Sequence, residues 1–237
     1  MENLKEGMFG KGVPERKKNV AAVAALVVYV ILAALYFLPV DIPYKISFPV
    51  AAIAVVSLWI LPWQMSLALV SSALGDFCGA SGNFTGQIEF FALAHLFLII
   101  FFVHKWFHDG KAFVRAGGRS PETRPWKLVA IGAFVLAVLV FAAVAIVPAA
   151  PAGVIRGCVA FYAVIICLML FCALVRHSRV YAAAAICFVF SDAVIGWNAF
   201  VSPVPGERYL IMLPYYAAQI MFFLRAAHLG RGACAQP

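Results

Sequence analysis

Four ionisable side chains lie inside long apolar stretches of the sequence. They are Asp76, Glu89, His95 and Asp192. In hydrocarbon each such group costs at least about 2.5–3.5 kcal/mol at mid-helix, so its presence there indicates a function. Carboxyl groups and an imidazole in this setting can deliver or accept protons, or hold a cation. Helix packing alone explains Asp76 and Asp192 poorly, because a neutral Asn would bridge helices at lower cost.

Uncharged polar residues accompany these four on the predicted helices. At about 1.5 Å of helix rise per residue, Asp76 lies under roughly 10 Å from the outer end of its span, and His95, Asp192 and Gln219 roughly 12–15 Å deep. We therefore expect one polar cavity in the outer half of the membrane. For Ser71, Ser72 and Tyr162 the simpler interpretation is hydrogen bonding between helices. Polar residues that we place around the cavity are Ser71, Ser72, Tyr162, Ser191, Asn198, Tyr216 and Gln219.

The elements that position these residues follow from composition. The chain of 237 residues is 65% apolar and only 12% charged, with a mean hydropathy of +0.98. Soluble domains are about 45–50% apolar and about 25% charged. The composition therefore excludes a nucleic-acid module and almost any soluble enzyme. It predicts an all-α fold, a polytopic bundle of transmembrane helices surrounded by membrane lipids.

Apolar runs long enough for helices number about eight, with seven as the alternative count. A span needs about 20 mostly apolar residues, so the short second run is the weakest. The runs are Val20–Leu38, Ile46–Leu61, Trp63–Ala80, Gln87–His104, Trp126–Val147, Gly153–Val175, Val180–Val201 and Arg208–Ala227.

The basic residues predict the orientation. All but three of the 18 Lys and Arg residues fall on one side of this eight-span topology, leaving Lys45, Arg156 and Arg208 on the other. Cytoplasmic loops carry the excess of Lys and Arg, so both termini are expected inside the cell. This distribution also accounts for the formal net charge of +8 without nucleic acid.

The expected domain organisation is simple. A basic cytoplasmic arm covers residues 1–19, a single transmembrane bundle domain residues 20–228, and a cytoplasmic tail residues 229–237. A basic cytoplasmic loop, about 105–126, is too short for a core of its own. Basic segments of this kind are attracted to anionic headgroups. The first apolar run is too long for a cleavable signal and no small-residue cleavage site follows it.

Neither a cofactor nor a metal is expected. The six cysteines form no Cys-x-x-Cys pair and no Cys/His cluster with metal-ligand spacing, so we interpret them as small buried apolar residues.

Three segments, taken in order, resemble one known family. The first reads SALGD at 72–76, NFTG at 83–86 and FALAH at 91–95, the second FYAVIICLM at 161–169, and the third FSDAVIGWNAF at 190–200, followed by YYAAQ at 215–219. In order and spacing the set resembles the YhhN/TMEM86 family of lysoplasmalogenases, over roughly Ser71 to Arg225. A single Gly-Asp or Ser-Asp pair would carry no information, whereas the ordered set is specific.

The resemblance implies an integral membrane hydrolase that cleaves the vinyl-ether bond of a lysophospholipid, a lysoplasmalogen with an ethanolamine or choline headgroup. Fatty aldehyde and a glycerophospho-base would be the products. Protonation of a vinyl ether resembles glycoside cleavage, in which two carboxyl groups share the acid and the stabilising or base roles. We expect Asp76, Asp192 and His95 to be catalytic. The expected substrate-binding residues are Ser191, Asn198, Tyr162, Tyr216, Gln219 and Glu89.

Other functions are compatible with the same residues. A transporter or a lipid-binding protein can use intramembrane carboxylates, although such proteins often show internal repeats or paired half-helices, which we do not find here. A serine hydrolase using Ser191 and His95 lacks the G-x-S-x-G turn. A metal-dependent hydrolase would draw on Asp76, His95 and Asp192. The composition, rich in Ala, Arg and Gly, favours a bacterial source and therefore the inner membrane.

Overall fold

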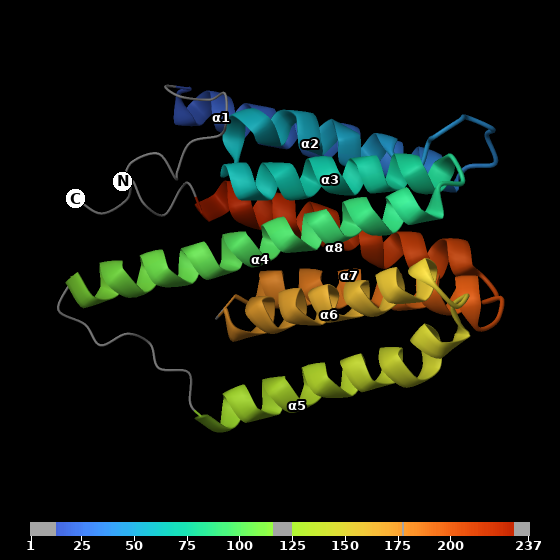
Figure 1. The fold of residues 1–237 in the computed structure, drawn as a ribbon. Helices are drawn as coiled ribbons and strands as arrows, with labels where there is room; N and C mark the ends of the chain where they lie inside the picture. The colour runs from blue at the N-terminus through green and yellow to red at the C-terminus, as the bar shows by residue number, and fades with distance from the viewer. Residues whose placement is uncertain (1–12, 116–124, 177, 230–237) are drawn as a thin grey trace. The chain divides into compact units, whose positions relative to one another are not determined.

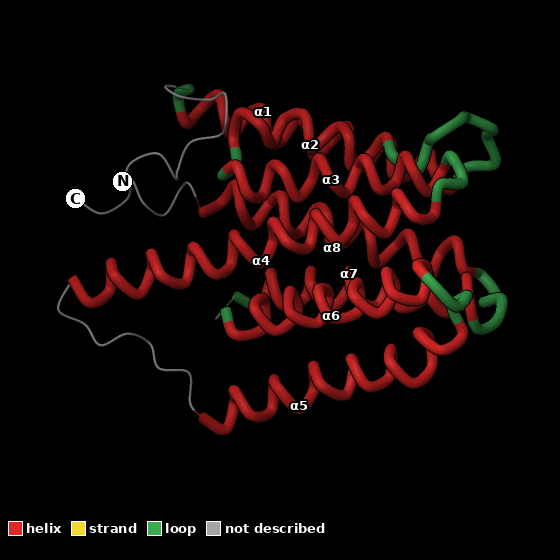
Figure 2. The backbone as a smooth tube through the Cα atoms, in the orientation of Figure 1, coloured by secondary structure: helices red, strands yellow, loops and turns green. Residues whose placement is uncertain are grey.

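The computed structural model describes residues 13–115, 125–176 and 178–229. Within these residues the chain forms eight α-helices and no β-strand (Figures 1 and 2). A π-helical turn, η1 (Ala142–Ile146), and a 3₁₀ turn, η2 (Val147–Ala149), continue the fifth helix. The helices are α1 (Glu15–Phe37), α2 (Phe48–Ile60), α3 (Trp63–Ala80), α4 (Phe84–Arg115), α5 (Pro125–Phe141), α6 (Val154–Val175), α7 (Arg179–Phe200) and α8 (Glu207–Leu229).

The prediction of an all-α polytopic membrane bundle is confirmed. Among the described residues, six helical segments are long and apolar enough to cross a membrane: α1, α4, α5 with its two turns, α6, α7 and α8. Helix α2 has 13 residues and would extend only about 20 Å at 1.5 Å per residue. Helix α3 has 18 residues, but it buries five polar ones, which lowers its hydropathy: Gln64, Ser66, Ser71, Ser72 and Asp76.

Several predicted boundaries differ from the observed ones. The first helix begins at Glu15, inside the N-terminal arm that we expected to extend to residue 19. Residues 1–12 of this arm lie outside the described residues. Helix α4 continues to Arg115, past the expected start of the basic loop at 105. Charged residues mark the edge of the membrane, and a helix can continue beyond that edge. Residues 116–124 of this loop and 230–237 of the tail lie outside the described residues.

The chain divides into two compact units, which we describe separately. Unit 1 comprises residues 1–97 and 215–237, and unit 2 comprises residues 98–214. Helices α4 and α8 each contribute one segment to each unit. The single bundle domain expected for residues 20–228 stays a prediction.

In unit 1 the first four helices follow one another in alternating directions, and the unit 1 part of α8 lies alongside (Figure 1). Only Leu61 and Pro62 separate α2 from α3. Across this corner the Ser66 hydroxyl donates a hydrogen bond to the Ser57 carbonyl oxygen at 2.8 Å. The turn between α3 and α4 contains Gly82 with φ +76°, a left-handed conformation that glycine adopts without steric cost.

In unit 2 the irregular turn η1 packs against α7. A methyl group on Gly196 would lie 3.1 Å from Ile146 Cγ2, so the absence of a side chain lets the two elements approach closely. The Arg156 guanidinium donates to the carbonyl oxygens of Pro148 and Ala150, which satisfies acceptors at the end of η2. Helix α5 buries none of its own residues, as expected for a helix that faces lipid.

Candidate functional site

The Asp76 carboxyl group in unit 1 is held by a tyrosine from the far end of the chain. The Tyr215 hydroxyl donates a hydrogen bond to Asp76 Oδ2 at 2.8 Å, and both residues are buried, with 3% exposure each. Asp76 lies near the end of α3, while Tyr215 follows Pro214 in α8. The bond therefore joins two apolar helices through a buried ionisable group, a situation that indicates function.

Aromatic packing fixes the orientation of Tyr215. The Phe91 ring meets the Tyr215 ring edge-on, with 5.8 Å between centroids. Glycine at position 75 admits Phe91, because a Cβ atom there would lie 3.2 Å from the ring. Gly75 thus lets α4 approach α3. The Phe91 ring of α4 in turn packs against Tyr215, whose hydroxyl bonds Asp76. This is the role of Gly75 in the SALGD segment.

One helical turn along from this contact, the same three helices carry a second polar layer. Ser72 precedes Asp76 by four residues, His95 follows Phe91 by four, and Gln219 follows Tyr215 by four. Because α3 runs opposite to α4 and α8 (Figure 1), these three steps lead in one direction. All three side chains are at most 2% exposed. Unit 1 therefore brings together the predicted residues Asp76, His95 and Gln219.

Two atoms of this second layer have defined hydrogen-bonding roles. His95 Nδ1 lies 2.6 Å from the Phe91 carbonyl oxygen, which can only accept, so Nδ1 carries the proton and Nε2 of the neutral ring is an acceptor. The Gln219 Nε2 atom is buried without a hydrogen-bond partner among the described residues. The layer thus presents an amide donor and an imidazole acceptor.

Tyr216, which we expected to bind substrate, makes structural contacts. Its hydroxyl donates to the Ile46 carbonyl oxygen at 2.8 Å, and its own carbonyl accepts from the Tyr29 hydroxyl at 2.7 Å. Its ring packs edge-on against Tyr29 and Tyr36. Tyr216 therefore joins α8 to α1 and to the segment before α2. A contact with substrate stays a prediction.

Asp192 in unit 2 also accepts a hydrogen bond from a tyrosine of another helix. The Tyr162 hydroxyl of α6 donates to Asp192 Oδ2 of α7 at 2.7 Å. Asp192 is half-buried, whereas the neighbouring Ser191 is fully buried, and its Oγ has no partner among the described residues. Unit 2 thus brings Tyr162, Ser191 and Asp192 together. Because Asp76 and Asp192 belong to different units, the single outer cavity stays a prediction.

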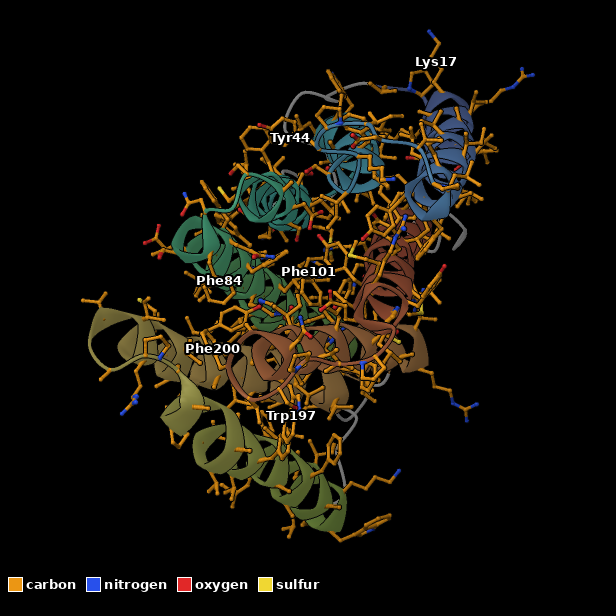
Figure 3. All side chains as sticks on the ribbon, turned by 90° about the vertical axis from the view of Figure 1, so that its right-hand side faces the viewer. Lys17, Tyr44, Phe84, Phe101, Trp197 and Phe200 are labelled. Carbon is orange, nitrogen blue, oxygen red and sulfur yellow. The ribbon has the colours of Figure 1, made fainter. Side chains whose placement is uncertain are left out.

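The two other predicted residues occupy different surroundings. Asn198 Oδ1 accepts a hydrogen bond from the Val204 amide at 2.8 Å, so this side chain closes the turn after α7. Trp197 and Phe200 lie near the same end of unit 2 (Figure 3). Glu89 is exposed on the first part of α4. Within either unit, the described residues contain no group of three His, Cys, Asp or Glu side chains that could hold a metal ion.

Tyr215 is not among the site residues expected from the sequence. Tyr216, three residues before Gln219, is expected to bind substrate, yet Tyr215 and Gln219, four apart, share a helix face equally well. Adjacent helical residues differ by about 100° in direction, and local spacing cannot say which of them faces Asp76. The YYAAQ segment was the available signal.

These features define a class: a polytopic helical membrane protein in which two aspartates of apolar helices each accept a hydrogen bond from a tyrosine of another helix. Comparison with known proteins then identifies the family. The chain belongs to the YhhN family, which it matches over residues 46–226.

Curated relatives agree with this assignment. The chain is 30% identical over 214 residues to lysoplasmalogenase TMEM86B of Mus musculus, covering 84% of each chain. It is 31% identical to the Rattus norvegicus protein of the same name, covering 84% of this chain and 82% of the relative. The Homo sapiens protein is 32% identical over 160 residues, 67% of this chain and 61% of the relative. No solved structure matches.

Proposed function

We propose that the protein is a lysoplasmalogenase, which hydrolyses the vinyl-ether bond of a lysophospholipid. Family membership and relatives that bear this name, at about 30% identity over most of the chain, support the reaction. The observation that carries the proposal for this chain is the buried hydrogen bond from Tyr215 to Asp76, with its counterpart from Tyr162 to Asp192. Cleavage of a vinyl ether begins with protonation of carbon, which a carboxyl group can perform.

The reaction consumes one water and needs no other reactant. A proton is added to the vinyl carbon farther from oxygen, and the ether oxygen shares the positive charge of the resulting oxocarbenium ion. Water adds to the cationic carbon and loses a proton, which gives a hemiacetal. Collapse of the hemiacetal breaks the carbon–oxygen bond, transfers a proton to the glycerol oxygen and releases a fatty aldehyde. A protonated carboxyl group and a carboxylate can serve the two charged stages, as in glycosidases.

We assign the acid to Asp192 and the stabilising or base role to Asp76. Tyr162 donates to Oδ2 of Asp192, so a transferable proton on this carboxyl group belongs on Oδ1. Tyr215 donates to Oδ2 of Asp76 in the same way, and in our proposal this carboxyl group is the ionised one that stabilises the oxocarbenium ion. The tyrosines thus orient the two carboxyl groups, and in our proposal they do not react.

The hydrolytic water belongs, in this proposal, to the second polar layer of unit 1. The Gln219 amide can donate to the water oxygen, and His95 Nε2 can accept a proton from it, because Nδ1–H is engaged with the Phe91 carbonyl. Ser72, buried on α3, is placed to complete the layer. An imidazole in this position would remove the proton that the captured water loses.

The membrane setting supports the proposed substrate class. A single-chain ether lipid carries its vinyl ether just below the headgroup, the depth at which the sequence places the aspartates. The apolar helix surfaces would accommodate the alkenyl chain. The composition supports the inner membrane of a bacterium as the location of the protein.

The test is release of fatty aldehyde from lysoplasmenyl-ethanolamine by the purified protein in detergent. We expect release by the wild type, with or without EDTA, and almost none by Asp192→Asn or Asp76→Asn. Asp41→Asn is the matched control, since it makes the same change at an exposed aspartate between α1 and α2. Absence of release by well-folded wild-type protein, with ethanolamine and choline headgroups both tried, would refute the proposed activity.

A further inference from the structure

The segment between α1 and α2 contacts three helices of unit 1 at three successive residues. The Tyr44 ring stacks on Phe77, next to Asp76, with centroids 4.7 Å apart and 24° between planes. Lys45 lies over the Tyr36 ring, with Nζ 5.9 Å from its centroid. The Ile46 carbonyl accepts the hydrogen bond from Tyr216, the neighbour of Tyr215. Residues 44–46, which we call the Lys45 rim, therefore contact α3, α1 and α8 in turn, near the end of α3 that carries Asp76.

The backbone of this rim is strained in a way that requires an explanation. Tyr44 has φ +58°, and it is the only described residue other than glycine with a positive φ. A bulky side chain rarely adopts this conformation, and such strain often occurs at ligand sites. The conformation lays the Tyr44 ring on Phe77 and leaves the next residue, Lys45, in contact with Tyr36. Figure 3 shows unit 1 from the end at which Tyr44 lies.

The Lys45 ammonium group is held in place but keeps donor capacity. Its Nζ donates to the Val40 carbonyl at 2.6 Å and to the Leu38 carbonyl at 3.1 Å. An ammonium group has three donors, so one remains for a ligand. Carbonyl oxygens and an aromatic face fix the cation without neutralising it. No other basic residue lies at this end of α3 among the described residues of unit 1.

We propose that Lys45 binds the phosphate of the substrate headgroup. This inference rests on the proposed function and adds to it the residue that distinguishes a phospholipid from a neutral ether lipid. From the rim, the aromatic contacts lead through Tyr36 to Tyr216 and Tyr215, whose hydroxyl bonds Asp76. In the lipid, one glycerol unit separates the phosphate from the ether oxygen. Phosphate at Lys45 would place the vinyl ether toward Asp76.

Kinetics on two substrates test the assignment. For Lys45→Gln, which keeps hydrogen-bond donors but loses the charge, we expect KM for lysoplasmenyl-ethanolamine to rise about tenfold, with kcat within about twofold. KM for 1-alkenylglycerol, which lacks phosphate, should not change. Lys45→Arg should restore most of the difference. Lys17→Gln, at an exposed lysine in the first turn of α1, is the charge-matched control and should match the wild type.

Binding of uncleavable lipids keeps this test independent of the reaction. By titration calorimetry in a nonionic detergent, wild-type protein should bind 1-alkyl-glycerophosphoethanolamine about tenfold more tightly than 1-alkylglycerol, and Lys45→Gln should abolish that preference. Equal losses for both lipids would assign Lys45 a purely structural role and overturn the proposal, as would no loss for either. Displacement by soluble glycerophosphoethanolamine at a similar Kd would overturn the lipid assignment. Failure to cleave any ether lipid, with the preference intact, would refute only the proposed activity.

Discussion

The hydrogen bond between Tyr215 and Asp76 offers the most direct test of the chemistry. Tyr215→Phe removes one oxygen atom and keeps the ring that contacts Phe91 at 5.8 Å and Tyr216 at 5.7 Å. The substitution therefore leaves the packing of α3, α4 and α8 in place. What it removes is a donor 2.8 Å from a buried carboxyl oxygen.

The magnitude follows from the kind of bond. A hydrogen bond to a charged group contributes about 1.5–3 kcal/mol. If that contribution is made in the transition state, each 1.36 kcal/mol corresponds to a factor of ten in rate. We therefore expect kcat/KM for aldehyde release to fall about 10- to 150-fold, mainly through kcat, because in our proposal the tyrosine orients Asp76 and does not bind the lipid.

The measurement is aldehyde release over a range of lysoplasmenyl-ethanolamine concentrations. The matched control is Tyr209→Phe, which removes the hydroxyl of a tyrosine that is 52% exposed on the same helix. Size-exclusion chromatography and a thermal melt establish that both variants are folded. If Tyr215→Phe retains wild-type kcat/KM while Asp76→Asn is inactive, the hydrogen bond does not support Asp76 in catalysis and our reasoning about this pair is wrong.

Three further predictions concern other contacts. Tyr162→Phe removes the donor 2.7 Å from Asp192 and should lower kcat by at least about tenfold with little change in KM; an unchanged kcat would contradict the assigned role. Asn198→Ala removes the acceptor for the Val204 amide and should cost about 1 kcal/mol, seen as a Tm about 2–4 °C lower in a thermal melt; an identical Tm would refute this. Gly75→Ala places a Cβ atom 3.2 Å from the neighbouring ring of α4. It should lower the free energy of unfolding by about 1–3 kcal/mol and reduce aldehyde release. An unchanged melting temperature and an unchanged rate would show that the ring moves aside freely.

The arrangement of helices could be predicted from the sequence because it depends on a strong, local signal. Apolar runs bounded by charge or proline mark the helices, and the run Trp63–Ala80 coincides with α3. The end of α4 could not be found in this way, since the pattern marks where the chain leaves hydrocarbon, and the helix continues to Arg115. Nor does the sequence signal the π-helical turn η1, whose residues are as apolar as those before it.

The candidate residues could be predicted by type but not by partner. Asp76 and Asp192 stand out because a carboxyl group in an apolar helix is costly. Their tyrosines lie 139 and 30 residues away in the chain, and no local period relates such positions. The choice of Tyr216 over its neighbour Tyr215 shows the difficulty, because one residue step turns the side chain to another helix.

The polar face of α3 has a consequence for how the protein enters the membrane. An isolated helix with an aspartate and four other buried polar residues is a weak signal for insertion, and the 13 residues of α2 fall short of the roughly 30 Å hydrocarbon core. We therefore expect the α2–α3 hairpin to be stable in the bilayer only when α4 and α8 cover these residues. Because α8 follows α3 in the chain, α3 would complete its integration only after α8 is synthesised. Assembly of the Asp76 site and membrane integration are then a single event, so truncation before Tyr215 should leave α3 accessible to water-soluble labels.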